Sequence, residues 1–138
     1  MIFPKTFQVI DFPLFDDERG QTIPIEFDET FPFDVKRTYF VTGNKGWERG
    51  SHAHHIEEEV FVVVSGSVTA LLHDGENEIE IHLDEKHKGL YVPKMIWHSF
   101  KDFSDNAVMV CFSSTPYMPG EQNYIMDINE FLKIKNGK

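Results

Sequence analysis

Two histidines separated by one residue, His52 and His54, stand just before the apolar stretch 60–64. In an extended segment, residues i and i+2 project from the same face, so both imidazoles point to one place while Ala53 points away. A third histidine, His98, ends a second strand-like run. If the two strands are neighbours in a barrel, three imidazoles meet inside it.

The spacing around these histidines is specific. It resembles the first signature of the cupin superfamily, whose glycine, histidine and glutamate positions are occupied here by Gly46, His52, His54, Glu59 and Gly66. The stretch 93–98 resembles the second signature, with Met95 where a glycine is usual. The resemblance implies an all-β fold, the cupin double-stranded β-helix or jelly roll.

Alternating apolar and polar residues independently predict a chain of short strands. We expect strands over 7–14, 22–27, 36–41, 60–64, 68–72, 79–83, 90–93, 99–103 and 107–112. A polar turn is expected at 16–20, and Asp74-Gly75 between apolar runs predicts a hairpin. A short C-terminal helix is indicated by Asp127 as N-cap, with Glu130 three residues later.

Composition narrows the class of protein. The chain has 138 residues, and 41% hydrophobic content with 14% aromatics argues for one folded domain over 1–138. A net charge of −10 disfavours nucleic acid as a partner. No apolar run approaches the roughly 20 residues of a membrane span, and Met1–Lys5 lacks the apolar stretch of a signal peptide. We therefore expect a cytoplasmic protein without a membrane partner.

The histidines support metal binding as one chemistry. His52, His54, Glu59 and His98 match by spacing the three-histidine, one-carboxylate set of metal cupins, which suits iron, manganese, nickel or zinc. In plain alternation from His54, however, Glu58 faces the same side as the histidines. Glu59 reaches the site only if a bulge intervenes.

Proton transfer without a metal is the second chemistry. Imidazole has an ordinary pKa of about 6.5, so it takes and returns a proton near neutral pH. Either His52 or His54 would serve as the base beside a ketone, and Tyr39 would donate to the developing oxygen anion. Candidates for holding a diphosphate are Arg19, Arg37 and Arg49.

A closer resemblance covers nearly the whole chain. Five stretches are similar to the nucleotide-sugar 3,4-ketoisomerases, cupins related in fold to dTDP-sugar 3,5-epimerases: Asp17–Gly20, Lys36–Tyr39, Arg49–His54, Gly89–Pro93 and Trp97–His98. The similarity continues through Tyr117 and 121–124 to the last helix. Its most specific element is Arg-Gly-x-His-Ala-His.

The resemblance implies isomerisation of dTDP-4-keto-6-deoxyglucose to a dTDP-3-keto-6-deoxyhexose, with no metal or other cofactor, in a route to 3-amino sugars of lipopolysaccharide or other glycans. It makes His54 and His52 the acid/base pair, with His54 favoured as the proton shuttle, and Tyr39 an assistant at the sugar. The predicted substrate contacts are Arg19, Arg37, Arg49, His98, Trp97 and Tyr124. The family also implies a homodimer with exchanged N-terminal strands.

Two positions depart from the family pattern. His55 stands where lysine is common, and Asn123 where an acidic residue is common. The configuration of the product at C4 and the nucleotide base stay open. Alternatives are a metal-dependent dioxygenase or isomerase, a non-catalytic sugar-binding cupin, and a 3,5-epimerase relative.

Overall fold

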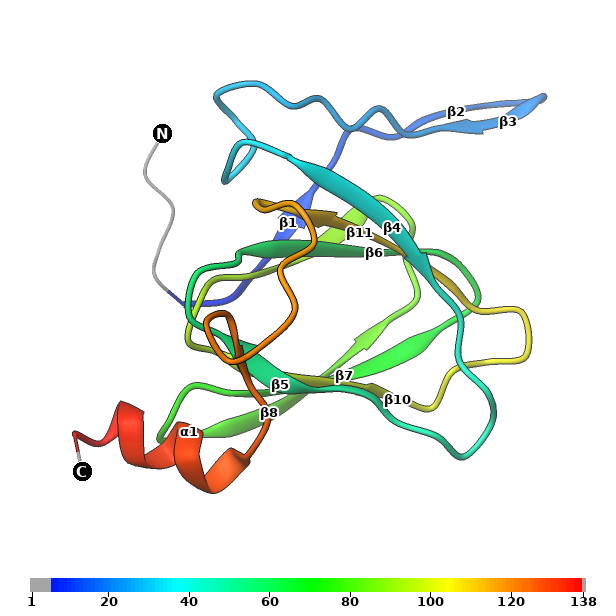
Figure 1. The fold of residues 1–138 in the computed structure, drawn as a ribbon. Coiled ribbons are helices and arrows are strands. Elements are labelled where there is room, and N and C mark those ends of the chain that lie inside the picture. Colours follow the sequence, from blue (N-terminus) through cyan, green and yellow to red (C-terminus); the bar gives the residue numbers. More distant parts are fainter. Residues whose placement is uncertain (1–5, 138) are drawn as a thin grey trace.

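The computed structural model describes residues 6–137, which form two five-stranded antiparallel sheets that face each other (Figure 1). The strand orders are β1-β9-β6-β11-β4 and β12-β5-β10-β7-β8, and β2 pairs with β3 in a separate hairpin. The elements are β1 (Gln8–Asp11), β2 (Phe15–Asp17), β3 (Gly20–Thr22), β4 (Arg37–Val41), β5 (Arg49–His54), β6 (Glu59–Ser65), β7 (Val68–His73), β8 (Glu78–Leu83), β9 (Lys88–Val92), β10 (Trp97–Lys101), β11 (Val108–Ser113), β12 (Tyr124–Ile125) and α1 (Ile128–Lys135).

The connections confirm the predicted jelly roll. From β4 to β7, each strand lies in the sheet opposite its predecessor, so neighbours within a sheet are seldom consecutive in sequence. Asp74-Gly75 lies in the turn of the β7–β8 hairpin, as predicted. Asp127 is the N-cap of α1, and its side chain accepts a hydrogen bond from the Asn129 amide. That contact satisfies one of the free N–H groups of the first turn.

One predicted strand is wrong. Of the stretch 22–27, only Thr22 belongs to a strand, as the last residue of β3. Pro24 has no N–H to donate to a sheet. Ile25 instead packs against a cluster of buried residues that includes Phe31, Val60 and Phe112. The apolar residues of this segment therefore cover the first sheet without joining it.

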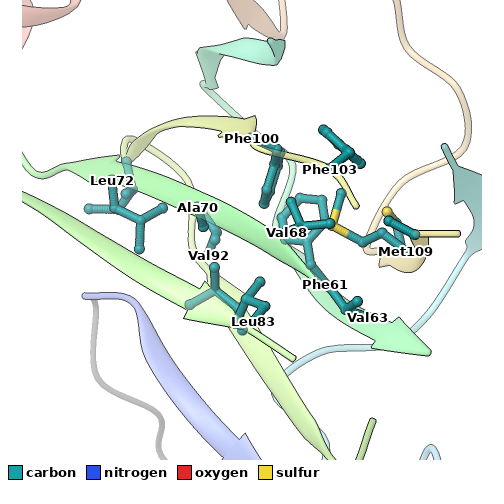
Figure 2. Packing of buried hydrophobic residues seen from close by; sticks show 14 residues of the cluster. Phe61, Val63, Val68, Ala70, Leu72, Leu83, Val92, Phe100, Phe103 and Met109 are labelled. Carbon is teal, nitrogen blue, oxygen red and sulfur yellow. The ribbon is translucent and has the colours of Figure 1, made fainter. Parts of the chain in front are cut away.

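Buried hydrophobic residues form the layer between the sheets (Figure 2). Among them are Phe61 and Val63 of β6, which alternate with Val60 and Val62 on the outer face of the same strand. Both faces of β6 are covered from Val60 to Val63, which explains the continuous apolar run there, whereas Val64 is 39% exposed. A third cluster lies behind the second sheet and joins it to α1 (Figure 1).

The expectations of no membrane span and no signal peptide are tested only over part of the chain. Within 6–137, no helix has the length and hydropathy that a membrane crossing requires. Met1–Lys5, for which we expect no signal peptide, and Lys138 lie outside the described residues.

Candidate active site

A cavity of about 380 Å³ opens between the two sheets. Its lining residues come from strands of both sheets and from the segment after β11. They are Arg37, Tyr39, Val41, Arg49, Gly50, His52, Glu59, Phe61, His98, Phe100, Met109, Tyr117 and Tyr124. Arg37, Tyr39 and Val41 are alternate residues of β4 and share its inner face. The cavity thus has a polar end with imidazoles and a carboxylate, and an apolar wall of aromatic side chains.

A bulge in β5 aims the first histidines at this cavity. His52 pairs with His98, and Gly50 with Ser99, so Ser51 is the extra residue. Gly50 has a φ of +81°, and a Cβ there would lie 3.1 Å from the His98 carbonyl oxygen. Glycine is therefore required at the bulge. The ring centroids of His52 and His98 are consequently only 4.8 Å apart across the strand pair.

Met95 occupies the position where the cupin signature usually has glycine. Its φ is +63°, which is uncommon for a residue with a side chain. Its amide donates to the His54 carbonyl oxygen at 2.8 Å. The turn before β10 is thereby tied to the end of β5, close to the histidines.

Glu59 faces the cavity, whereas Glu58 faces outward. β5 ends at His54 and β6 begins at Glu59, and residues 55–58 carry the chain from one sheet to the other. Alternation does not persist through this crossing, so its prediction that Glu58 faces the site is wrong. Glu58 accepts a hydrogen bond from the Tyr91 hydroxyl at 2.5 Å.

The Glu59 carboxylate is the meeting point of the polar side chains. Its Oε1 lies 3.3 Å from His54 Nδ1 and 3.5 Å from His98 Nε2, and its Oε2 accepts from the Tyr39 hydroxyl. Burial raises the pKa of Glu59, but its interactions with His98, led by a hydrogen bond, and the hydrogen bond from Tyr39 outweigh it and lower that pKa to about 2. Burial and the Glu59 charge raise the pKa of Tyr39, which keeps its hydroxyl protonated.

His52 and His54 differ in access to the cavity. His52 lines it, while His54 is 3% exposed and lies behind, with ring centroids 4.7 Å apart. Burial lowers the pKa of His52 to about 4, with a further contribution from His98. Burial likewise lowers the pKa of His54 to about 3, against the opposing charge of Glu59. Both rings are uncharged at neutral pH, and each keeps a nitrogen lone pair.

Glu57 is a buried charged residue that sequence reasoning did not identify. It is 1% exposed and accepts hydrogen bonds from Arg37 Nη2 at 2.9 Å, Ser113 Oγ at 2.8 Å and Asn123 Nδ2 at 2.9 Å. Burial, with the charge of Glu59, raises its pKa. The run of three glutamates was visible in the sequence, but no pattern there indicated that Glu57 turns inward.

Arg37 is held between two aromatic rings. Its guanidinium carbon lies 5.2 Å from the Tyr39 ring centroid and 5.7 Å from that of Tyr117. Tyr117 is 70% exposed and was not among the predicted contacts. Arg49 also lines the cavity and is exposed, so two guanidinium groups border its polar end.

Two predicted contacts lie away from the cavity. The Arg19 side chain is 86% exposed and pairs with Asp17 at 2.6 Å in the projecting β2–β3 hairpin (Figure 1). Trp97 is 7% exposed and packs on Phe131 of α1, with ring centroids 5.9 Å apart. Because Trp97 precedes His98 on β10, the two side chains point to opposite faces of the sheet. This placement gives no support to Trp97 as a substrate contact.

Comparison with known proteins agrees with this geometry. Residues 5–136 match the family described as "FdtA: WxcM-like, C-terminal". The chain is 40% identical over 127 residues to the TDP-4-oxo-6-deoxy-alpha-D-glucose-3,4-oxoisomerase of Aneurinibacillus thermoaerophilus, a match that covers 91% of this chain and 90% of the relative. The chain belongs to the WxcM-like FdtA family.

Solved structures place the FdtA-family chain among the sugar ketoisomerases. A 3,4-ketoisomerase from Helicobacter canadensis superimposes with a TM-score of 0.86 at 33% identity, covering 94% of this chain and 97% of that one. QdtA, a sugar 3,4-ketoisomerase from Thermoanaerobacterium thermosaccharolyticum solved with TDP, gives 0.89 at 29% identity and covers 96% of each chain. The predicted family, fold and isomerase class are confirmed.

Proposed function

We propose that the chain is a single-domain cytoplasmic isomerase that converts dTDP-4-keto-6-deoxyglucose to a dTDP-3-keto-6-deoxyhexose. The observation that carries this proposal is that His52 lines a cavity bordered by two arginines in a chain 40% identical to an oxoisomerase. Burial lowers the pKa of His52 to about 4, which favours the uncharged ring that a base requires. The relatives supply the substrate class, and the cavity supplies groups suited to its chemistry.

The reaction moves one carbon-bound proton and one oxygen-bound proton. His52 removes the proton from C3, which leaves an enediolate, and returns a proton to C4. The proton on O3 leaves as O4 gains one, so the formula is unchanged. His54 has no access to the cavity lining, so we assign it to supporting the His52 ring from behind.

Tyr39 meets the sugar mainly as a hydrogen-bond acceptor. Its hydroxyl proton is donated to Glu59, so the oxygen lone pairs remain for the sugar hydroxyl that loses its proton. This refines the predicted role of Tyr39 as a donor. His98 and Tyr124 complete the cavity wall beside the sugar. Their ring centroids lie 4.8 and 4.9 Å from that of His52.

The arginines have different tasks. Arg37 is already paired with Glu57 and stacked on tyrosines, so we assign it to shaping the cavity as well as to attracting the anion. Arg49 is exposed at the lining, where its guanidinium can hold a diphosphate through two parallel hydrogen bonds.

Proton NMR of the chelator-treated protein with dTDP-4-keto-6-deoxyglucose in heavy water tests the reaction. We expect a 3-keto product with deuterium at C4. In a parallel reaction in ordinary water, the coupling of C4–H to C5–H in the product defines the configuration at C4. The His52→Asn variant should form product far more slowly. Substrate that is bound but unchanged would indicate a non-catalytic sugar-binding protein, and turnover only after a divalent metal is restored would indicate a metal-dependent enzyme.

We also propose a homodimer in which N-terminal strands are exchanged. The β2–β3 hairpin extends beyond the sheets and carries Phe15, which is 64% exposed, together with Arg19 (Figure 1). In a dimer this hairpin would be covered, and Arg19 would reach the diphosphate of the partner's cavity. Light scattering should give twice the chain mass, and Arg19→Ala should raise KM. A monomer at enzyme concentrations that support full turnover contradicts the dimer.

A further inference from the structure

A second buried carboxylate, Glu57, lies behind the wall of the cavity. Glu57 does not line the cavity and is 1% exposed, and the proposed reaction gives it no task. Its oxygens accept hydrogen bonds from Arg37, Ser113 and Asn123 at distances of 2.8–2.9 Å. Because three donors converge on two oxygens, this position suits a carboxylate. An amide would turn its NH₂ group toward one of the donors.

The Arg37 guanidinium is held on three sides. Its Nη2 donates to Glu57 Oε2 at 2.9 Å, and its Cζ lies 5.2 and 5.7 Å from the ring centroids of Tyr39 and Tyr117. The remaining group, Nη1, is buried and has no hydrogen-bond partner among the described residues. A buried donor without an acceptor is unfavourable. An oxygen of an anion bound in the cavity would satisfy it.

The contact between Glu57 and Arg37 fixes a flexible side chain before any ligand binds. Arginine has many rotamers, and ordering such a side chain during binding reduces affinity. Glu57 belongs to the segment 55–58 that crosses between the sheets, whereas Arg37 begins β4, 20 residues earlier in the chain. The crossing segment therefore orients an arginine that lines the cavity on the opposite sheet from β5.

We propose that Glu57 is a positioning residue, which holds the Arg37 guanidinium so that Nη1 binds a phosphate oxygen of the nucleotide sugar. The inference rests on the proposed function for the identity of this ligand. A carboxylate near an anion site also repels the anion. Orientation by Glu57 and repulsion by its charge therefore change the affinity in opposite directions, and the sign of the effect distinguishes them.

Isothermal titration calorimetry of the full chain with dTDP measures this sign. Glu57→Asp keeps the charge but withdraws it from Arg37 by one methylene, and Glu57→Gln keeps the length but removes the charge. We expect the Kd for dTDP to rise by about 2–10-fold in both variants, because one more side chain must be ordered on binding. If Glu57 acted only through its charge, Glu57→Gln would bind dTDP more tightly and Glu57→Asp would bind as the wild type does. That result overturns the proposal.

Arg37→Lys tests whether Glu57 acts through Arg37. Lysine keeps the positive charge but has no planar fork to orient. In the Arg37→Lys background, Glu57→Asp should have little further effect on the Kd for dTDP. An equal rise in both backgrounds overturns the proposal. His54 is another neighbour, with Nε2 3.7 Å from Glu57 Oε1, and an effect through His54 would appear in kcat instead of KM.

Asn123→Ala is the matched control for a general loss of stability. It removes one hydrogen bond from the same carboxylate but leaves the bond between Glu57 and Arg37. Its Kd for dTDP should stay close to that of the wild type when measured below the unfolding transition. A rise equal to that of Glu57→Asp would mean that any loosening of the network weakens binding, and it overturns the proposal. Circular dichroism establishes that each variant is folded, and Glu57→Asp, which keeps the ion pair, serves if Glu57→Gln does not fold.

Steady-state kinetics with dTDP-4-keto-6-deoxyglucose separate this inference from the proposed function. For Glu57→Asp we expect a higher KM with kcat close to that of the wild type, because Arg37 binds the diphosphate and not the reacting carbons. An unchanged KM, or a fall in kcat alone, overturns the positioning role while the proposed function stands. A wild-type chain that neither binds dTDP nor isomerises the sugar overturns both.

Discussion

The two faces of the sheet that carries β5 and β10 are made from alternate residues of the same strands. On the inner face, His52 and His98 border an open cavity backed by buried carboxylates. On the outer face, Ala53 and Trp97 are buried against Phe131 of α1, which is 0% exposed. One residue along a strand thus separates a reactive imidazole from an apolar contact.

The inner face provides the reactive groups, and the outer face provides stability. Burying charged groups on the inner face costs solvation free energy, and the cavity leaves lining atoms without packing partners. The outer face buries apolar area against a helix, which stabilises the strands. We infer that the outer face holds β5 and β10 in place so that the inner face can keep an unfavourable but reactive arrangement. Substitutions on the two faces should therefore act on different quantities.

His52→Asn should produce the largest change and leave the fold intact. Loss of a positioned acid/base group reduces kcat by about 10²–10⁴-fold, while the unfolding free energy should change by less than about 1 kcal/mol. Kinetics with dTDP-4-keto-6-deoxyglucose and urea unfolding measure the two effects. His55→Asn, at an exposed neighbouring position, is the matched control and should retain activity. Wild-type kcat in His52→Asn would remove this residue from the proposed mechanism.

Phe131→Ala should act in the opposite way. Removing a fully buried aromatic ring lowers the unfolding free energy by about 3–5 kcal/mol. Activity per folded molecule should stay close to that of the wild type below the unfolding transition, since Phe131 does not line the cavity. Ile134→Ala on the same helix, 43% exposed, should cost far less. Equal losses in the two variants, measured by urea unfolding, would contradict the supporting role of the outer face.

Asn123→Ala tests the layer beneath the inner face. The variant deprives the Glu57 carboxylate of one hydrogen bond and leaves the amides of Ile56 and Glu57 without their Asn123 Oδ1 acceptor. Unpaired buried groups of this kind cost about 1–3 kcal/mol each. Thermal unfolding should show a clear loss for Asn123→Ala and almost none for the exposed Asn129→Ala. Similar melting temperatures in both variants would mean that the loop relaxes and water replaces the amide.

Period-two alternation was sufficient to predict the barrel and the inward histidines, because it is a local property of strands. It failed where the chain leaves a strand. It selected Glu58 instead of Glu59 because residues 55–58 cross between sheets, whereas the spacing of the cupin signature pointed to Glu59. The Asn123–Glu57 contact joins residues 66 positions apart, which no local pattern encodes. The strand predicted over 22–27 was wrong because a segment that lies across a sheet without joining it can also alternate apolar and polar residues.

Trp97 illustrates a different limit. A tryptophan beside a histidine at the end of a strand suggests a binding pair, but alternation puts the two side chains on opposite faces, so with His98 facing the cavity Trp97 faces away. Both faces of β10 are buried, and the docking of α1 is what covers Trp97. Arg19 was equally ambiguous, since its proposed contact requires a second chain.

Trp97→Phe should have the smallest effect on activity, and it is the most direct test of whether the inner and outer faces of the sheet act separately. Because the ring packs on α1, we expect KM for the dTDP sugar to change by less than about twofold, with about 1 kcal/mol lost from the unfolding free energy. Trp47→Phe, at a 71% exposed position, is the matched control and should change neither quantity. Steady-state kinetics decide the matter: a clear rise in KM for Trp97→Phe alone would mean that the outer face communicates with bound sugar, and the two faces could no longer be treated as separate.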